Sequence, residues 1–199
     1  MAGLHAQEAG QGEADGACAH LLQGSGSPLR HRITVNTIAA PRWPPVVAAA
    51  VAALLVAGLG AAATDLSPWY EALQKPAWQP PAWLFGPAWT LIFGLAAMAG
   101  VLGWVHAPDD RARRRMLSLF ALNGGLNVLW SALFFHFRRP DWALYEVGLL
   151  WLSVACLALH LRGASRKAAR LLLPYLAWVA FAAALNLAVV DLNAPFAAH

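Results

Sequence analysis

Residues 69–93 read WYEALQKPAWQPPAWLFGPAWTLIF and hold four of the ten Trp and four of the thirteen Pro in the chain. The only charged residues in this Trp/Pro segment are Glu71 and Lys75. Proline fixes φ and removes a backbone donor, so a long regular helix is not expected until about Pro87. Tryptophan supplies large apolar faces with one N–H donor. Such a segment is typical of a lid over a ligand or of an anchor at a membrane interface, and its surroundings decide between the two.

Long stretches without charge flank the Trp/Pro segment. The chain is 59% hydrophobic and 12% charged, which is about half the charge of an ordinary soluble domain. A bilayer span requires about 20 mostly apolar residues. We therefore predict an all-α, polytopic membrane protein with a bundle of five transmembrane helices. The expected helices cover residues 44–63, 86–106, 116–137, 142–161 and 171–190.

Basic residues divide unevenly between the two ends of the predicted bundle. Eleven Lys and Arg precede the first helix or lie in the loops after the second and fourth, whereas three lie in the other loops. The positive-inside rule then predicts a cytoplasmic N-terminus, with the C-terminus and the Trp/Pro segment outside. The charge count favours a cytoplasmic membrane, with a bacterial cell membrane as the expectation and a bacterial or mitochondrial outer membrane as the alternatives. Because these charges lie in short loops rather than on one folded face, no nucleic-acid partner is expected.

The two ends of the chain differ in composition from the predicted bundle. Residues 1–42 are rich in Gly, Ala, Gln and Ser without apolar periodicity, which predicts a disordered N-terminal tail. The membrane domain is expected over residues 43–193, with a short C-terminal tail at 194–199. Cys18 lies in the N-terminal tail and Cys156 within a predicted helix, so neither a disulfide framework nor a zinc site is expected.

Asn and Trp recur at helical spacing in three predicted helices. In the third helix, Asn123, Asn127 and Trp130 are separated by four and three residues and share one face. An Asn in hydrocarbon is costly without a partner, so this face is expected to point into the bundle. The corresponding inward positions are Trp89, Phe93 and Gly100 in the second helix and Trp178, Ala182 and Asn186 in the fifth.

These inward faces have two interpretations. A single Trp or Asn is best explained by interhelical packing, whereas three converging faces beneath a Trp-rich segment favour a ligand cavity at least as well. Small residues such as Ala121 and Gly125 allow either close packing within the bundle or a homodimer face. Glu146 is a candidate functional residue because it lies within a span, but its position about one turn inside the fourth helix favours a solvated or snorkelling side chain. No catalytic constellation and no metal-ligand spacing is found.

Several spaced motifs agree in order with one family of membrane proteins. The Trp/Pro segment follows the pattern WY-x-x-LQKP-x-WQPP-x-W-x-F-x-x-x-W-x-x-x-F. Further motifs are LN-x-x-W at 126–130, FF at 134–135, LLLPY-x-x-W at 171–178 and ALN at 184–186. Over about residues 45–193 the chain resembles the translocator proteins, also called tryptophan-rich sensory proteins or peripheral benzodiazepine receptors (TspO/MBR). The resemblance implies a five-helix membrane bundle that is often a homodimer.

The resemblance also implies a function. We expect a membrane receptor or transporter that binds a tetrapyrrole such as protoporphyrin beneath the loop between the first two helices, without a resident cofactor or metal. The alternatives are an enzyme that degrades bound porphyrin oxidatively in light, and a module that binds sterol or regulates a partner. Family positions occupied differently here are Phe93, usually Tyr, and Asn123, usually Gln. The implied ligand-binding residues are Trp69, Trp78, Phe85, Trp89, Phe93, Asn123, Asn127, Trp130, Trp178 and Ala182.

Overall fold

The computed structural model describes residues 43–196 of the chain. The described residues belong to one compact unit, Pro41–His199. The predicted disordered tail at residues 1–42 lies outside the described residues, as do the last three residues of the predicted C-terminal tail.

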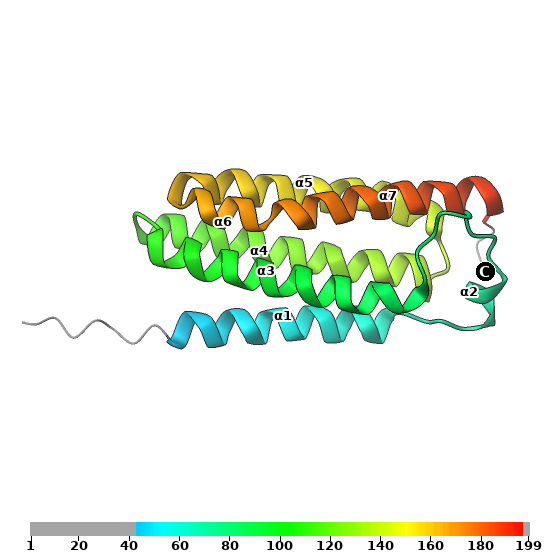
Figure 1. The fold of residues 1–199 in the computed structure, drawn as a ribbon, viewed down its shortest axis with the longest axis horizontal. Coiled ribbons are helices and arrows are strands. Elements are labelled where there is room, and N and C mark those ends of the chain that lie inside the picture. Colours follow the sequence, from blue (N-terminus) through cyan, green and yellow to red (C-terminus); the bar gives the residue numbers. More distant parts are fainter. Residues whose placement is uncertain (1–42, 197–199) are drawn as a thin grey trace, which may run out of the picture. The chain divides into compact units, whose positions relative to one another are not determined.

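Five helical segments in this unit are long and apolar enough to cross a membrane (Figure 1). The predicted all-α class with five transmembrane helices is confirmed, and the described residues contain no strand. The long helices are α1 (Trp43–Ala63), α3 (Phe85–His106), α4 (Asp110–Ser131), α5 (Pro140–Ala164) and α7 (Leu173–Asn193).

Four short elements complete the chain path. The helix α2 (Pro68–Ala72) and the 3-10 turn η1 (Ala82–Leu84) lie in the α1–α3 loop, residues 64–84. The π-helical turn η2 (Ala132–His136) extends α4. The helix α6 (Arg166–Leu171) forms one span with α7, and the two are separated at Leu172 because Pro174 lacks the N–H that would continue the hydrogen-bond ladder.

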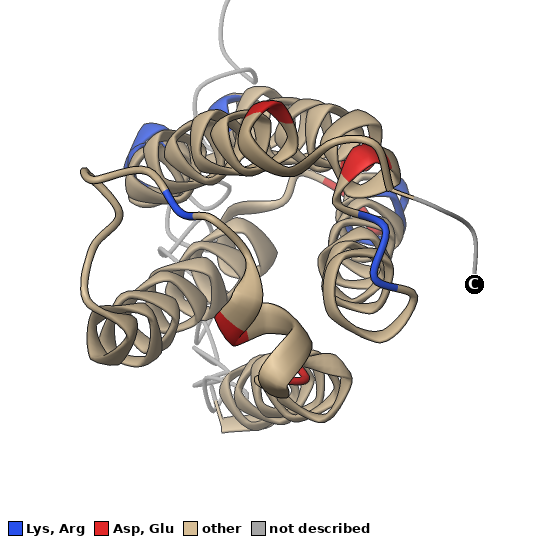
Figure 2. Cartoon of the chain, turned by 90° about the vertical axis from the view of Figure 1, so that its right-hand side faces the viewer, with Lys and Arg blue, Asp and Glu red and all other residues tan. Residues whose placement is uncertain are grey.

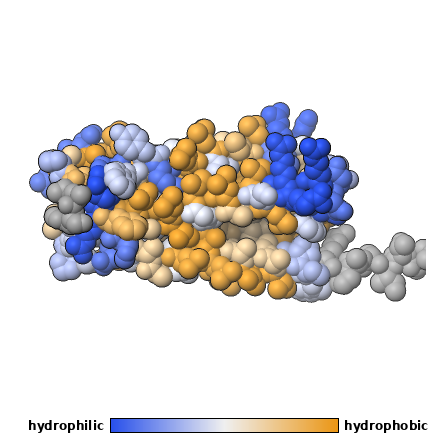
Figure 3. All heavy atoms as spheres, turned by 180° about the vertical axis from the view of Figure 1, so that it is seen from behind, coloured by the Kyte–Doolittle hydropathy of each residue, from blue (hydrophilic) through white to orange (hydrophobic). Residues whose placement is uncertain are grey.

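The helices pack into a ring in the order α1, α3, α6–α7, α5 and α4, which Figure 2 shows from one end. The helix α5 supplies the largest share of the core, whereas Gly60 is the one buried residue of α1. Apolar side chains cover the outer surface around the middle of the bundle, and hydrophilic residues gather at its two ends (Figure 3). This distribution is the one that a bilayer requires of a spanning bundle.

Several helices extend beyond the ranges predicted from hydropathy, most clearly at the two ends of the loops after α3 and α5. The helix α4 begins at Asp110, six residues before the predicted start, and Asp109 caps it by accepting a hydrogen bond of 2.7 Å from the Ala112 N–H. The helix α5 continues to Ala164, and Ser165 alone separates it from α6. The loops expected at residues 107–115 and 162–170 are thus largely helical. Hydropathy marks the apolar part of a helix, whereas capping and backbone hydrogen bonds decide where the helix ends.

Small residues allow close helix contacts inside the bundle. A Cβ built on Gly103 of α3 would overlap Leu161 Cδ2 of α5 and lie 2.8 Å from Met116 Sδ of α4. A Cβ built on Gly94, on the same helix, would meet nothing within 4 Å. A side chain at Gly103 would therefore displace the ends of the Leu161 and Met116 side chains, whereas one at Gly94 would meet no neighbour.

We predict that Gly103→Val lowers the free energy of unfolding by about 1–3 kcal/mol, because the added methyl groups force the Leu161 and Met116 side chains out of their positions. Thermal unfolding in detergent measures the change, with Gly94→Val as the matched control. Equal melting temperatures for the two variants would contradict the close packing at Gly103.

Candidate functional site

Aromatic rings from α3 and α7 form a connected cluster around Trp89. Trp89 stacks on Phe93, with ring centroids 5.3 Å apart. On the opposite helix it meets Tyr175 and Trp178 edge-on, at 6.1 and 6.3 Å. These rings therefore join the two helices through aromatic faces and edges, which are the surfaces that a flat apolar ligand needs.

The α1–α3 loop joins the same cluster. Phe85, the first residue of α3 after the loop, meets Trp178 edge-on at 5.7 Å. Trp78 within the loop meets Phe181 of α7 at 5.9 Å, and Phe181 in turn contacts Trp178 at 5.4 Å. The structure thus brings five of the predicted site residues into one aromatic cluster, namely Trp78, Phe85, Trp89, Phe93 and Trp178.

A buried polar network lies beside this cluster. The Asn127 side-chain amide donates a hydrogen bond of 3.2 Å to the Tyr175 hydroxyl, which donates one of 3.3 Å to Asn123 Oδ1. Asn123 also donates to Ser153 Oγ at 2.8 Å. The network joins α4, α5 and α7, and its residues are nearly inaccessible to solvent. The predicted Asn residues therefore reach the Trp89 cluster through Tyr175, whose ring contacts Trp89.

Asn186 of α7 has a separate role. It is buried, and its side-chain amide fits its surroundings when it donates to Pro140 O at 3.1 Å and accepts from Leu144 N at 3.0 Å. It therefore fastens α7 to the first turn of α5.

Trp130 belongs to a second group of rings, at the junction of α4 and η2. It contacts Phe134 at 5.1 Å and Phe135 at 6.1 Å, and Phe135 contacts Tyr70 of α2 at 5.4 Å. Burial in this group raises the pKa of the Tyr70 phenol above its ordinary value, so Tyr70 stays neutral. The Trp130 Nε1–H is buried and has no hydrogen-bond partner among the described residues. It is an available donor inside the bundle.

Glu146 corrects a prediction. Its side chain is only 5% exposed, and neither carboxyl oxygen has a hydrogen-bond partner among the described residues. The prediction of a solvated or snorkelling Glu146 is wrong, because its face of α5, shared with Ala143, Leu150 and Ser153, packs against the neighbouring helices. A polar group buried without a partner is costly, and an intramembrane carboxyl is for that reason a candidate functional group.

Trp69 and Ala182 lie at the margin of these groups. The Trp69 ring lies 5.8 Å from the guanidinium of Arg138, and Arg138 is exposed. Ala182 is half-buried on α7, one residue after Phe181. The ten predicted residues thus fall into the Trp89 cluster, the polar network, the Trp130 group and these two positions.

Hydrogen bonds hold the α1–α3 loop in place. Asn193, the last residue of α7, accepts from Gln74 N and donates to Gln74 O, each at 2.8 Å. Lys75 Nζ donates to the carbonyls of Tyr70 at 2.7 Å and of Glu71 and Leu73 at 3.3 Å. An ammonium group has three donors, so Lys75 is fully engaged within the loop.

Three residues of the site escaped the sequence-based prediction. Tyr175 links the polar network to the Trp89 cluster, Phe181 receives Trp78, and Ser153 binds Asn123. Tyr175 could have been predicted from the sequence, because it precedes Trp178 by three residues and Ala182 by seven and so shares their helical face. Phe181 and Ser153 carry no comparable signal, since their partners lie on other elements.

The fold and this interior together define an integral membrane protein, a ring of five spanning helices lined inside by Trp, Phe and Asn. The sequence profile of the TspO/MBR family matches residues 46–191, and the chain belongs to this family. The resemblance seen in the sequence motifs is therefore confirmed.

Individual relatives agree with this assignment. The chain is 39% identical over 145 residues to the tryptophan-rich protein TspO of Archaeoglobus fulgidus, covering 73% of this chain and 93% of that protein. It is 36% identical over 150 residues to the translocator protein of Bos taurus, covering 74% and 89%. It is 32% identical over 136 residues to protein CrtK of Rhodobacter capsulatus, covering 67% and 85%.

We predict that Tyr175→Phe lowers the free energy of unfolding by about 1–3 kcal/mol, because the buried amides of Asn123 and Asn127 each lose a partner. Thermal or denaturant unfolding in detergent measures the loss. Tyr145→Phe on α5 is the matched control, since Tyr145 is 81% exposed. If both variants melted together, the Tyr175 hydroxyl would not be holding the network.

We further predict that Asn193→Ala speeds amide hydrogen exchange in the α1–α3 loop about tenfold, because two hydrogen bonds to Gln74 are lost. Exchange measured by mass spectrometry on peptides covering residues 73–80 reports the effect. Leu192→Ala, an exposed neighbour on the same helix end, is the control and is expected to leave exchange unchanged.

Proposed function

We propose that this TspO/MBR family protein binds a flat tetrapyrrole such as metal-free protoporphyrin between α3 and α7, beneath the α1–α3 loop. The observation that carries the proposal is the connected aromatic cluster in which Trp89 and Trp178 meet across the two helices at 6.3 Å. Binding serves the transport or sensing of the tetrapyrrole.

Ring contacts supply the main attraction. A macrocycle inserted between α3 and α7 replaces ring–ring contacts of Trp89 and Trp178 with contacts to its own faces, so aromatic packing is kept while apolar ligand surface leaves water. Each such contact contributes roughly 0.5–1.5 kcal/mol beyond burial. Entry also requires the contact between Trp78 and Phe181 to open, which makes the α1–α3 loop the gate.

Polar groups at the loop end of the bundle and in its interior suit the periphery and centre of a metal-free porphyrin. Arg138 is exposed beside Trp69 and is the better partner for a propionate, because Lys75 is engaged by three carbonyls. Inside the bundle, Trp130 Nε1 offers a donor and the Glu146 carboxyl offers acceptor oxygens. His106 and His136 are exposed, and His160 contacts Ala112 near the start of α4, so none of these three is placed as an axial ligand to iron.

Quenching of Trp fluorescence by protoporphyrin tests the proposal. We expect saturable quenching with the full chain in detergent in the dark, and a Kd raised about tenfold or more by Trp89→Leu or Trp178→Leu, because each removes a stacking face. The control is Trp83→Leu, which removes an exposed Trp of the same loop that lies outside the cluster. An unchanged Kd in both cluster variants would overturn the site.

The same titration under illumination separates binding from degradation. If the porphyrin absorbance changes in light no faster with the protein than in a protein-free sample, the result supports binding for transport or sensing. Conversion to a new absorbing product with the native chain, lost in Trp89→Leu, would instead identify an enzyme acting on the bound porphyrin.

A further inference from the structure

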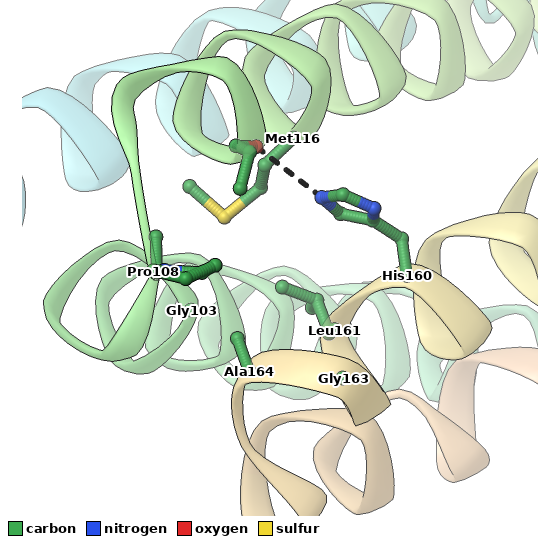
Figure 4. A pocket seen from close by; sticks show the side chains of 9 residues that line it. Gly103, Pro108, Met116, His160, Leu161, Gly163 and Ala164 are labelled. Atoms are coloured by element: carbon green, nitrogen blue, oxygen red, sulfur yellow. Dashed lines mark hydrogen bonds between the residues drawn. The ribbon is translucent and has the colours of Figure 1, made fainter.

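A cavity of about 260 Å³ lies at the end of the bundle opposite the α1–α3 loop (Figure 4). It is bounded by the end of α3, the start of α4 and the end of α5. Met116, Leu161 and Ala164 face this space, and Gly103 and Gly163 complete its walls. The cavity is therefore mainly apolar, although it lies near the end of the membrane-spanning unit.

One ionisable side chain is part of the lining. His160 of α5 points into the region between α4 and α5, and its Nε2 lies 3.3 Å from the Ala112 carbonyl (Figure 4). A single half-buried imidazole does not make a polar site, so the cavity suits an apolar group rather than a small solvated ion.

Several residues that line the cavity have arginines as neighbours in the sequence. Ala112 and Met116 are four residues apart and form one stripe of α4, and Arg111 and Arg115 form the adjacent stripe, also four apart. On α5, Arg162 lies between the lining residues Leu161 and Gly163. Arginines thus stand next to lining residues in the sequence on two helices, and none of them is itself part of the lining.

The net charge of this whole end of the bundle is also positive. In the described unit, eight Lys and Arg on α4, the end of α5 and α6 stand against Asp109 and Asp110, a net charge of +6. Asp109 caps α4 and Asp110 pairs with Arg113 at 2.9 Å, so both acids are engaged. Within the described residues no carboxylate pairs with the remaining seven, which are Arg111, Arg114, Arg115, Arg162, Arg166, Lys167 and Arg170.

The other end of the bundle is different. The basic residues there are Lys75, Arg138 and Arg139, and the acidic residues are Asp65, Glu71, Asp141 and Asp191, which gives a net charge of −1. Among the described residues Lys75 and Arg138 have no carboxylate partner either, so the features that distinguish the end with the cavity are its net charge of +6 and the apolar cavity itself.

We propose that this end of the bundle binds an anionic phospholipid, with the head-group phosphate held by the arginines of α4 and α5 and an apolar part of the lipid in the cavity. Arginine matches a phosphate with two parallel hydrogen bonds. Basic pockets between spanning helices at the membrane surface are suited to anionic head groups. A free phosphate would use the arginines alone and leave the apolar cavity empty, so the two features together select a lipid.

Native mass spectrometry of the full chain released from detergent tests the site. We expect phosphatidylglycerol to bind at least about tenfold more tightly than phosphatidylcholine with the same acyl chains, and its binding to weaken as salt is raised. Arg111→Gln combined with Arg115→Gln is expected to remove most of this preference.

A cavity-filling variant tests the apolar half of the site. A Cβ built on Gly163 meets nothing within 4 Å, so Gly163→Leu is expected to fold and to lower phosphatidylglycerol binding about tenfold by occupying the cavity. Gly148→Leu, at an exposed and equally open position of α5, is the matched control and is expected to bind as the native chain does.

Three results would overturn the proposal. One is equal binding of the two lipids. Another is phosphatidylglycerol binding that survives both the Arg111/Arg115 and Gly163 variants. The third is displacement of the lipid by inorganic phosphate at equal concentration, which would identify a small-anion site.

Discussion

A polar side chain placed in hydrocarbon must find its hydrogen-bond partner inside the protein, and Tyr175 provides that partner here. Its hydroxyl lies between Asn127 and Asn123, and Asn123 reaches on to Ser153 of α5. The same ring packs against Trp89. One residue therefore sets the register of α4, α5 and α7 and also holds the aromatic cluster in place, so the geometry of the candidate site depends on the satisfaction of the buried amides.

The α1–α3 loop is held more weakly than the interior that it covers. Its attachments are ring contacts such as Trp78 with Phe181, a pair of hydrogen bonds between Gln74 and Asn193, and the internal bonds of Lys75. These bonds lie at exposed or half-buried positions, whereas the Tyr175 network is buried. Segments with few buried contacts open at low free-energy cost, so the loop can open while the bundle keeps its packing.

Prediction from the sequence succeeded where a single strong constraint acts. Uncharged runs identified the five spans, because hydrocarbon tolerates few charges along a helix. The start of α4 was misplaced, because Arg111 and the charged residues after it belong to a helix that Asp109 caps beyond the apolar stretch. At the site, Asn and Trp spacing indicated the inward faces, but Phe181 and Ser153 depend on partners from other elements. Glu146 was misjudged because its depth along the helix said nothing about which neighbours cover it.

The amino-acid sequence alone establishes the class of protein, the membrane-spanning pattern and the family, since each follows from local composition or from spaced motifs. Contacts between segments distant in the chain appear only on folding. These include the meeting of Trp89 with Trp178, the link between Gln74 and Asn193, the unpartnered Glu146 and the cavity beside the arginines of α4 and α5. The physical reason is that spacing along one helix decides which side chains share a face, whereas the packing of five helices decides what each face meets.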